Sequence, residues 1–278
     1  MNEAFAPAKI NLTLHVTGQR HDGYHLLDSL VVFADIGDRL TFETDADLTL
    51  TVTGPNALGV PVDDSNLVLR AARMVDANLG AKITLVKTLP TAAGIGGGSS
   101  NAAATLKALG QMWAKPLPGN PEWLGADVPV CLRGRATRMQ GIGEQLSDAP
   151  DLPPAWLVLV NPRVSVPTPA VFKTLVQKTN APMPKTLPAF ASATAFSDWL
   201  GSMRNDLQDA AISLEPVIGT ALSALRATNG CLLARMSGSG ATCWGMFGDA
   251  QSAAQAAARV QQANPSWWVV SSEIKAFS

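Results

Sequence analysis

A glycine-rich run at residues 90–100 constrains this chain more than any other stretch. It reads Pro-Thr-Ala-Ala-Gly-Ile-Gly-Gly-Gly-Ser-Ser and leads into an alanine-rich segment that predicts a helix from about Ser99 or Ser100. Glycine has no Cβ, so such a loop can take positive φ and approach a bulky ligand closely. A glycine loop followed by the unpaired N–H groups of a helix N-terminus is typical of an anion site, most often one for phosphate. The serine hydroxyls can cap the helix or contact a phosphate or its Mg²⁺.

The loop matches neither of two familiar phosphate-binding patterns. A Walker loop ends in Gly-Lys-Ser/Thr, whereas here Asn101 follows the two serines and no lysine stands in that place. A dinucleotide fingerprint needs Gly-x-Gly-x-x-Gly with a carboxylate about 20 residues later, and here the third glycine is missing. The alternative is a flexible glycine hinge between a strand and a helix. The loop alone leaves both interpretations open.

Composition excludes several function classes. The 278 residues are enough for one large or two small domains, and with 47% hydrophobic and 15% charged residues they describe a globular protein. The net charge of −1, without a basic run, argues against nucleic acid as the main ligand. The three cysteines form no CxxC pair, which fits a reducing cytosol. No apolar stretch approaches the roughly 20 residues that span a bilayer, so we expect a cytoplasmic protein without a membrane partner.

Hydrophobic periodicity predicts a mixture of strands and helices in the first half of the chain. Residues 8–16 alternate between apolar and polar side chains, as a strand does. Further strands are predicted at 30–36, 39–43, 48–53 and 83–87, with a turn at Gly37-Asp38. A helix should run from Ser65 to about Leu79, closed by Gly80. A second helix follows the glycine loop, with one apolar face formed by Ala102, Leu106, Leu109 and Trp113.

The proline-rich stretch at residues 150–154 predicts a domain boundary, which divides the chain into 1–150 and 151–278. A second proline-rich connector is expected at 177–196. In the second half the pattern predicts strands at 156–160, 231–235, 242–247 and 267–270, and helices at 205–214, at 216–228 and after Asp249. Strands and helices do not alternate regularly, which favours an α+β fold over a doubly wound sheet.

Two clusters near the N-terminus carry candidate functional side chains. Lys9 and Asn11 lie two apart on a predicted strand and therefore point the same way. Alone, the two residues favour a solvated strand face over a functional site. Tyr24, the only tyrosine of the chain, lies beside His25 in a predicted turn. Such a pair can bind a nucleobase or another ring, because bases stack on aromatic side chains, or it can be an ordinary hairpin turn.

Two further clusters lie later in the chain. Asp127 stands in Gly-Ala-Asp-Val-Pro, where a fixed and uncrowded carboxylate suits a general base. Capping aspartates are more common, so that alternative stays open. The second glycine loop, Ser-Gly-Ser-Gly-Ala at residues 237–241, lies between two predicted strands. It is either a hairpin or a loop that closes over a phosphate from the opposite side.

Taken together, these motifs resemble one family. Pro-Ala-Lys-Ile-Asn-Leu, Pro-x-x-x-Gly-Ile-Gly-Gly-Gly-Ser-Ser and Ser-Gly-Ser-Gly-Ala are similar, in the same order, to the three motifs of the galactokinase/homoserine/mevalonate/phosphomevalonate (GHMP) kinases. The resemblance spans essentially the whole chain. It implies the GHMP kinase fold, of class α+β, with a ribosomal-protein-S5-like part in the N-terminal domain (1–150), an α+β C-terminal domain (151–278) and the site in the cleft between them.

Additional elements narrow the resemblance to one branch of the family. These are Asp-Gly-Tyr24-His25, Gly-Ala-Asp127-Val-Pro and Pro-Thr-Pro-x-Val-Phe172. They imply that ATP, with Mg²⁺, phosphorylates the 2-hydroxyl of 4-diphosphocytidyl-2-C-methyl-D-erythritol, in the non-mevalonate route to isoprenoid precursors. The resemblance leaves open whether the protein is a monomer or a homodimer. The connection at 114–124 is shorter than the family usually has.

The resemblance also assigns roles to single residues. Lys9 and Asp127 are implied as the catalytic pair, and no acidic metal ligand is evident next to the loop. The residues implied to hold ATP are Pro90, Ala92, Ala93, Gly94, Ile95, Gly96, Gly97, Gly98, Ser99 and Ser100. Those implied to hold the phosphate acceptor are Asn11, Tyr24, His25, Thr168, Phe172, Gly238 and Gly240, with Tyr24 and Phe172 on opposite faces of the cytosine.

Two other functions compete with this interpretation. A GHMP kinase for mevalonate derivatives or homoserine would act on an acceptor without a base, which leaves Tyr24, His25 and Phe172 without a purpose. A nucleotide-binding regulator could have kept the fold and lost catalysis. The presence of Lys9 and Asp127 speaks against that regulator.

Overall fold

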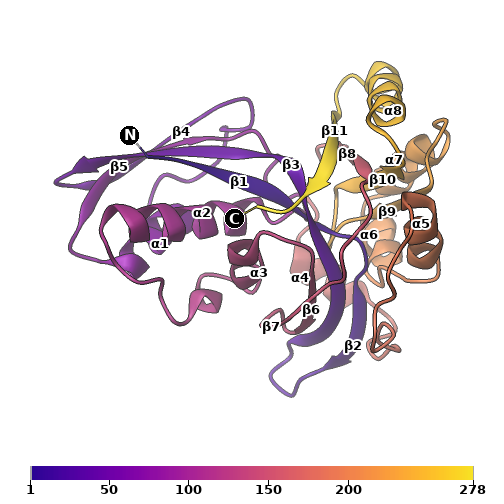
Figure 1. The fold of residues 1–278 in the computed structure, drawn as a ribbon, viewed down its shortest axis with the longest axis horizontal. Helices are drawn as coiled ribbons and strands as arrows, with labels where there is room; N and C mark the ends of the chain where they lie inside the picture. The colour runs from indigo at the N-terminus through magenta and orange to yellow at the C-terminus, as the bar shows by residue number, and fades with distance from the viewer. Residues whose placement is uncertain (1, 278) are drawn as a thin grey trace.

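One long strand, β3 (His25–Asp45), organises the architecture of the computed structural model, which describes residues 2–277. It pairs antiparallel with four strands of the N-terminal half: β1 (Asn2–Asn11), β2 (His15–Gln19), β5 (Gly80–Val86) and β6 (Thr137–Gly141). It also pairs with β11 (Trp268–Lys275), the last strand of the chain. Since β11 belongs to the C-terminal sheet as well, β3 connects the two halves (Figure 1).

The N-terminal half consists of this sheet with helices packed on one face. The strand β4 (Leu48–Thr53) extends it in parallel with β5, and β7 (Gln145–Asp148) pairs with β6. The helices are α1 (Leu67–Val75), α2 (Gly97–Met112), the short 3-10 helix η1 (Pro121–Trp123) and α3 (Val128–Arg133). Buried side chains such as Leu40 and Phe42 of β3 pack with Leu109 of α2 to form the core between the layers.

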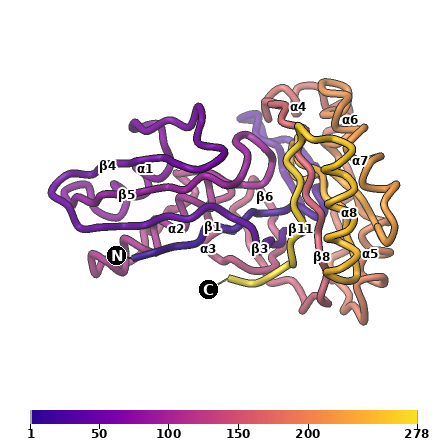
Figure 2. Tube along the Cα trace, turned by 90° about the horizontal axis from the view of Figure 1, so that it is seen from above, coloured from indigo at the N-terminus to yellow at the C-terminus, as the bar shows by residue number. Residues whose placement is uncertain are grey.

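The C-terminal half is a second antiparallel sheet with helices around it. Its strand order is β11, β8 (Trp156–Asn161), β10 (Cys243–Phe247) and β9 (Leu233–Met236). The helices α5 (Ala193–Gly201), α6 (Gln208–Leu214), α7 (Val217–Arg226) and α8 (Ala250–Ala263) lie along this half, on the side away from β4 and β5 (Figure 2). The helix α4 (Thr168–Thr174) lies where the two halves meet. The mixture confirms the α+β class.

The predicted turn at Gly37-Asp38 is wrong, because both residues lie inside β3. The pairing of β1 with β3 shifts register between Pro7 and Ala8, and Gly37 sits opposite this shift. A Cβ on Gly37 would collide with the carbonyl of Ala6. The glycine therefore permits a close approach of two strands at a bulge, where the sequence suggested a chain reversal.

Two helices begin at other residues than predicted. The helix α1 is capped by Asn66, whose side chain accepts the N–H of Val68, so Ser65 lies outside it. Gly80 opens β5 and does not end α1. The helix α2 begins at Gly97, since Gly96 takes the left-handed conformation (φ 62°) directly before it. The glycine loop thus supplies the first turn of α2.

Most predicted elements of the second half are present with shifted ends, and Asp249 caps α8 by accepting the N–H of Ser252. The helices α3, α4 and α5 are not among the predicted elements, since they are short or lie next to prolines. The predicted division between 150 and 151 falls between β7 and β8 and stays a prediction.

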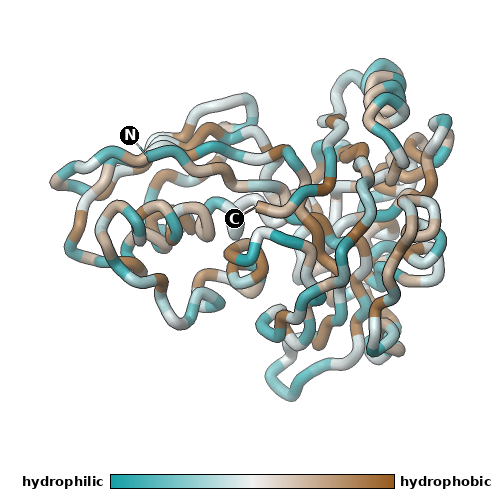
Figure 3. The backbone as a smooth tube through the Cα atoms, viewed as in Figure 1, coloured by the Kyte–Doolittle hydropathy of each residue, from teal (hydrophilic) through white to brown (hydrophobic). Residues whose placement is uncertain are grey.

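Hydrophobic segments follow the strands where the halves meet, and the tip between β2 and β3 is hydrophilic (Figure 3). Within residues 2–277, no helix is long and apolar enough to cross a membrane.

A buried histidine joins β2 to two segments of the C-terminal half. Nδ1 of His15 lies 3.0 Å from the carbonyl oxygen of Ala181, and Nε2 accepts the backbone N–H of Arg204 at 3.2 Å. Burial lowers the pKa of His15 below 6.5, against the hydrogen bond to Ala181, which raises it. His15 is therefore neutral in the folded protein at neutral pH, as the hydrogen bond that Nε2 accepts requires.

We expect His15 to make stability depend on pH. Its pKa is lower in the folded than in the unfolded chain, so its contribution is complete above pH 6.5 and is lost as the pH falls toward the folded value. The slope from one such group is at most about 1.4 kcal/mol per pH unit. The free energy of unfolding, measured with a denaturant between about pH 7 and 5, should fall more steeply with decreasing pH in the wild type than in His15→Gln. Parallel curves for the two proteins would contradict this account.

Candidate active site

The strand β1 supports both glycine loops through hydrogen bonds. The N–H of Lys9 donates to the carbonyl of Ile95 at 3.0 Å, within the first loop. The N–H of Asn11 donates to Oγ of Ser237, and that hydroxyl donates to the carbonyl of Gly94, both at 3.0 Å. One serine hydroxyl thus connects β1, the first loop and the second loop.

The two loops also touch each other backbone to backbone. Gly94 has a φ of +71°, and a Cβ there would lie 2.6 Å from the carbonyl oxygen of Ser237. A Cβ on Gly238 would lie 2.9 Å from the carbonyl oxygen of Gly94. Glycine is required at both positions because no side chain fits. Gly240 takes part in the same contact, because a Cβ on Gly94 would lie 2.7 Å from its carbonyl oxygen, but Gly240 does not line the cavity described next.

A cavity of about 610 Å³ opens in front of the first loop. The predicted ATP-loop residues that line it are Pro90, Ala92, Ala93, Gly94, Gly96, Gly97, Gly98 and Ser99. Ile95 and Ser100 do not. Ile95 is buried in the hydrophobic core, and Oγ of Ser100 donates to the carbonyl of Pro7 at 2.6 Å. Asn11, Thr168, Phe172 and Gly238 also line this cavity.

The start of α2 fits a phosphate chain. A Cβ on Gly97 or Gly98 would meet nothing closer than 3.4 Å, so their absent side chains leave space that the fold does not fill. The helix has 16 residues, and its first N–H groups have no partner within the helix. For Mg²⁺ the wall offers the Ser99 hydroxyl and the Asp127 carboxylate, and residues 2–277 hold no cluster of three potential metal-binding side chains. Phosphate oxygens and water would have to complete the coordination.

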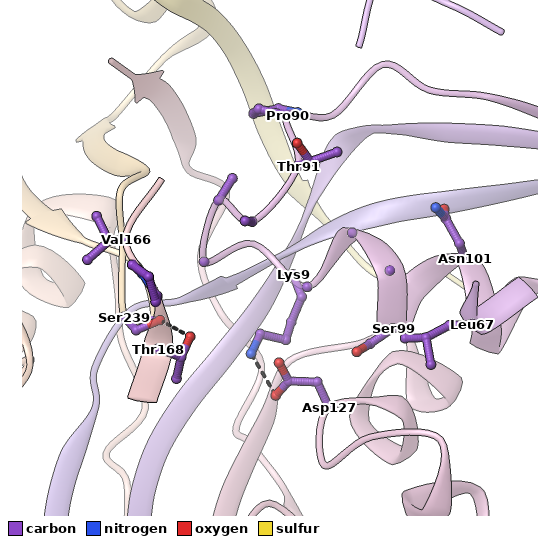
Figure 4. A pocket seen from close by; sticks show the side chains of 18 of the residues that line it. Lys9, Leu67, Pro90, Thr91, Ser99, Asn101, Asp127, Val166, Thr168 and Ser239 are labelled. Atoms are coloured by element: carbon purple, nitrogen blue, oxygen red, sulfur yellow. Dashed lines mark hydrogen bonds and ion pairs between the residues drawn. The ribbon is translucent and has the colours of Figure 1, made fainter. Parts of the chain in front are cut away.

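Lys9 and Asp127 form an ion pair inside this cavity, with 2.8 Å between Nζ and Oδ1 (Figure 4). Lys9 is 4% exposed and Asn11 is buried, so neither lies on a solvated strand face. Asp127 occupies the position before α3, but its side chain makes no capping hydrogen bond. The carboxylate is one-third exposed and remains available to a ligand. Ser99 points toward the same space.

A second cavity of about 790 Å³ adjoins the first at Asp127, Ser99 and Thr168. Phe172 lines both cavities, whereas Tyr24 and His25 line only the second. His25 stacks on Phe172, with 4.5 Å between ring centroids and 18° between planes, while Tyr24 is 62% exposed.

The His25 ring is suited to recognising a polar edge. Its Nε2 is buried and has no hydrogen-bond partner in the described part of the chain. Burial, followed by the charge of Lys178, lowers the pKa of His25, which keeps the ring neutral at neutral pH. A buried nitrogen without a partner costs free energy unless a ligand satisfies it.

Sequence reasoning missed three features of the first cavity. Its walls include Lys87, Asn101 and a loop with Val60 and Pro61. A Walker loop carries its lysine within the loop, whereas Lys87 lines the cavity from the end of β5. A lysine between Val86 and the apolar pair Leu89-Pro90 could have drawn attention, because lysine is seldom buried without a partner.

Comparisons with known proteins give the family. The model described as "GHMP kinases N terminal domain" matches residues 66–135, and "GHMP kinases C terminal" matches 186–266. The chain belongs to the GHMP kinase family. It is a small-molecule kinase, and GHMP kinases use ATP as co-substrate.

This GHMP kinase has highly similar relatives named 4-diphosphocytidyl-2-C-methyl-D-erythritol kinase. The protein of Cereibacter sphaeroides is 60% identical over 97% of this chain and 98% of its own length. That of Paramagnetospirillum magneticum is 51% identical over 97% of both chains. A crystal structure of 4-(cytidine 5'-diphospho)-2C-methyl-D-erythritol kinase superposes with a TM-score of 0.79 at 32% identity, over 99% of this chain and all of the other. A mevalonate kinase structure (TM-score 0.65, 11% identity, 99% of each chain) shows the same fold.

We expect Gly97→Val to weaken ATP binding without unfolding the GHMP kinase. The position has ordinary φ and free space, so a valine fits the protein but occupies the space of the phosphate chain. Calorimetry should show at least about tenfold weaker ATP binding, which corresponds to the loss of one or more charge-assisted hydrogen bonds to the phosphates. Gly119→Val, in an open loop outside both cavities, is the control and should bind like the wild type. Unchanged ATP affinity in folded Gly97→Val would place the phosphates elsewhere.

Proposed function

We propose that this GHMP kinase transfers the γ-phosphoryl group of ATP to the 2-hydroxyl of 4-diphosphocytidyl-2-C-methyl-D-erythritol, a step of the non-mevalonate route to isoprenoid precursors. The observation that carries the proposal is the meeting of two cavities at the Lys9–Asp127 pair. One cavity offers a glycine loop and a helix N-terminus, and the other ends in aromatic rings. Highly similar relatives bear the name of this activity.

The first cavity would hold ATP, with its phosphates at the start of α2. Gly97 and Gly98 leave room for the phosphate chain, and the positive end of the helix dipole favours its charge. When bound, Mg²⁺ would neutralise charge on the phosphates, and Ser99 and Asp127 of the cavity wall could supply oxygen ligands. Positioning and charge stabilisation account for most of a protein's contribution to phosphoryl transfer.

Asp127 would accept the proton of the acceptor hydroxyl. A tertiary alcohol is a crowded and weak nucleophile, so the base has to lie within hydrogen-bond reach of it. Lys9 orients the carboxylate at 2.8 Å and adds a positive charge next to the attacking oxygen. The shared wall of the two cavities is where the hydroxyl and the γ-phosphate can meet.

The aromatic end of the second cavity would hold the cytosine. Phe172 and Tyr24 offer ring faces, and Nε2 of His25 offers a polar contact that no described residue satisfies. Mevalonate and homoserine carry no base and would leave this end empty. Stacking tolerates any base, so discrimination must come from hydrogen bonds that a wrong base leaves unpaired.

We predict that Asp127→Asn abolishes phosphoryl transfer while ATP and the acceptor still bind. An amide cannot take the proton, and the loss of a general base costs about 10²–10⁴ in rate. Single-turnover rates and ATP affinity should be measured in the same preparation. Asp198→Asn, an exposed aspartate on α5 outside both cavities, is the control and should turn over normally. Turnover of Asp127→Asn within twofold of the wild type would refute the assignment.

We predict that Tyr24→Ala weakens the use of the cytidylyl acceptor by about 1–3 kcal/mol in kcat/KM, because one stacking surface is lost. ATP affinity should stay nearly unchanged. His25→Ala should mainly reduce the preference for the cytidylyl over the uridylyl analogue. Trp123→Ala, which removes another exposed aromatic ring outside both cavities, is the control. If Tyr24→Ala harms ATP binding, the ring belongs to the nucleotide site and the choice of acceptor loses its support.

A further inference from the structure

A buried carboxylate fixes the segment that leads into the first glycine loop. Asp38 of β3 is fully buried, and its Oδ1 accepts the backbone N–H groups of Thr88 at 2.7 Å and Leu89 at 2.8 Å. Its Oδ2 lies 2.7 Å from Nζ of Lys87. One side chain thus orders three consecutive residues directly before Pro90, where the loop begins.

The ammonium group of Lys87 lies at the start of α2. Lys87 is buried, lines the first cavity, and also donates to the carbonyl of Leu89 at 2.7 Å. A Cβ on Gly97 would lie 3.5 Å from its Nζ. An ammonium has three N–H donors, and two are used by Asp38 and Leu89. The third N–H remains for a ligand beside Gly97.

Stability alone does not account for this pair. A buried ion pair loses hydration on both partners, and replacing it with apolar side chains is often neutral or stabilising. Among the walls of the first cavity the lysines are Lys9 and Lys87, and Lys9 is engaged by Asp127. Only a charged pair can place a cation at the N-terminus of α2, where an anion such as phosphate would bind, and two apolar side chains could not do so.

We infer that Asp38 is a positioning residue for the nucleotide, which holds Lys87 so that its third N–H reaches an ATP phosphate. Lys87 then supplies from the end of β5 the positive charge that a Walker loop takes from the lysine within it. The inference rests on the proposed function in taking ATP as the nucleotide. It concerns binding, so it can be tested without the acceptor.

The test uses Lys87→Met, Asp38→Asn and the double variant. Asp38→Asn should be the least stable, because it leaves Lys87 buried without a charge partner. The double variant removes both charges and should recover most of the stability. If Lys87 only stabilised the fold, ATP affinity would recover with it. We expect instead that the double variant binds ATP at least about tenfold more weakly than the wild type, while KM for the acceptor changes less than twofold.

The matched control is Asp76→Asn with Lys115→Met, which removes an ion pair of the same half outside both cavities. It should bind ATP like the wild type. Lys87→Gln, which keeps hydrogen bonding but loses the charge, is the fallback if the double variant does not fold. Wild-type ATP affinity in either folded variant would overturn the inference. A wild type that binds ATP but does not phosphorylate the acceptor would refute the proposed function and leave this inference standing.

Discussion

The site depends on one junction, at which β1 is hydrogen-bonded to both glycine loops. The hydroxyl of Ser237 accepts from Asn11 and donates to Gly94, and the N–H of Lys9 donates to Ile95. The same strand that carries Lys9 toward Asp127 therefore fixes the loop in front of which the first cavity opens. A shift of β1 would displace the first glycine loop and the Lys9–Asp127 pair together, because both are joined to this one strand.

The glycines serve two different physical purposes at this junction. Gly94 and Gly238 are required by the protein, because a Cβ would strike the backbone of the facing loop. A Cβ on Gly97 or Gly98 would make only ordinary van der Waals contacts, so the packing of the protein does not require glycine there. The backbone is therefore tightly packed where Gly94 meets Gly238, and the start of α2 at Gly97 and Gly98 lies open to the first cavity. Such a preformed site lowers the cost of ordering two substrates for transfer between them.

The sequence predicted which residues lie together at the two cavities better than it predicted the path of the chain. Motifs located the glycine loops, Lys9 and Asp127, because each depends on residue types at short spacing. The turn predicted at Gly37 is wrong because local sequence cannot distinguish a turn from a bulge whose partner strand lies elsewhere in the chain. Lys87 and Asp38 escaped because their pairing joins residues 49 apart. The stacking of His25 on Phe172 was likewise hidden by long-range topology.

The most direct test of the central claim is to identify the product. ATP and 4-diphosphocytidyl-2-C-methyl-D-erythritol would be incubated with the protein, and the acceptor examined by phosphorus and carbon NMR. The account predicts one ADP per acceptor consumed and a new phosphomonoester on the tertiary C2 oxygen, the hydroxyl that Asp127 would deprotonate. ADP release that does not depend on this acceptor, or a phosphate on another hydroxyl, would contradict it.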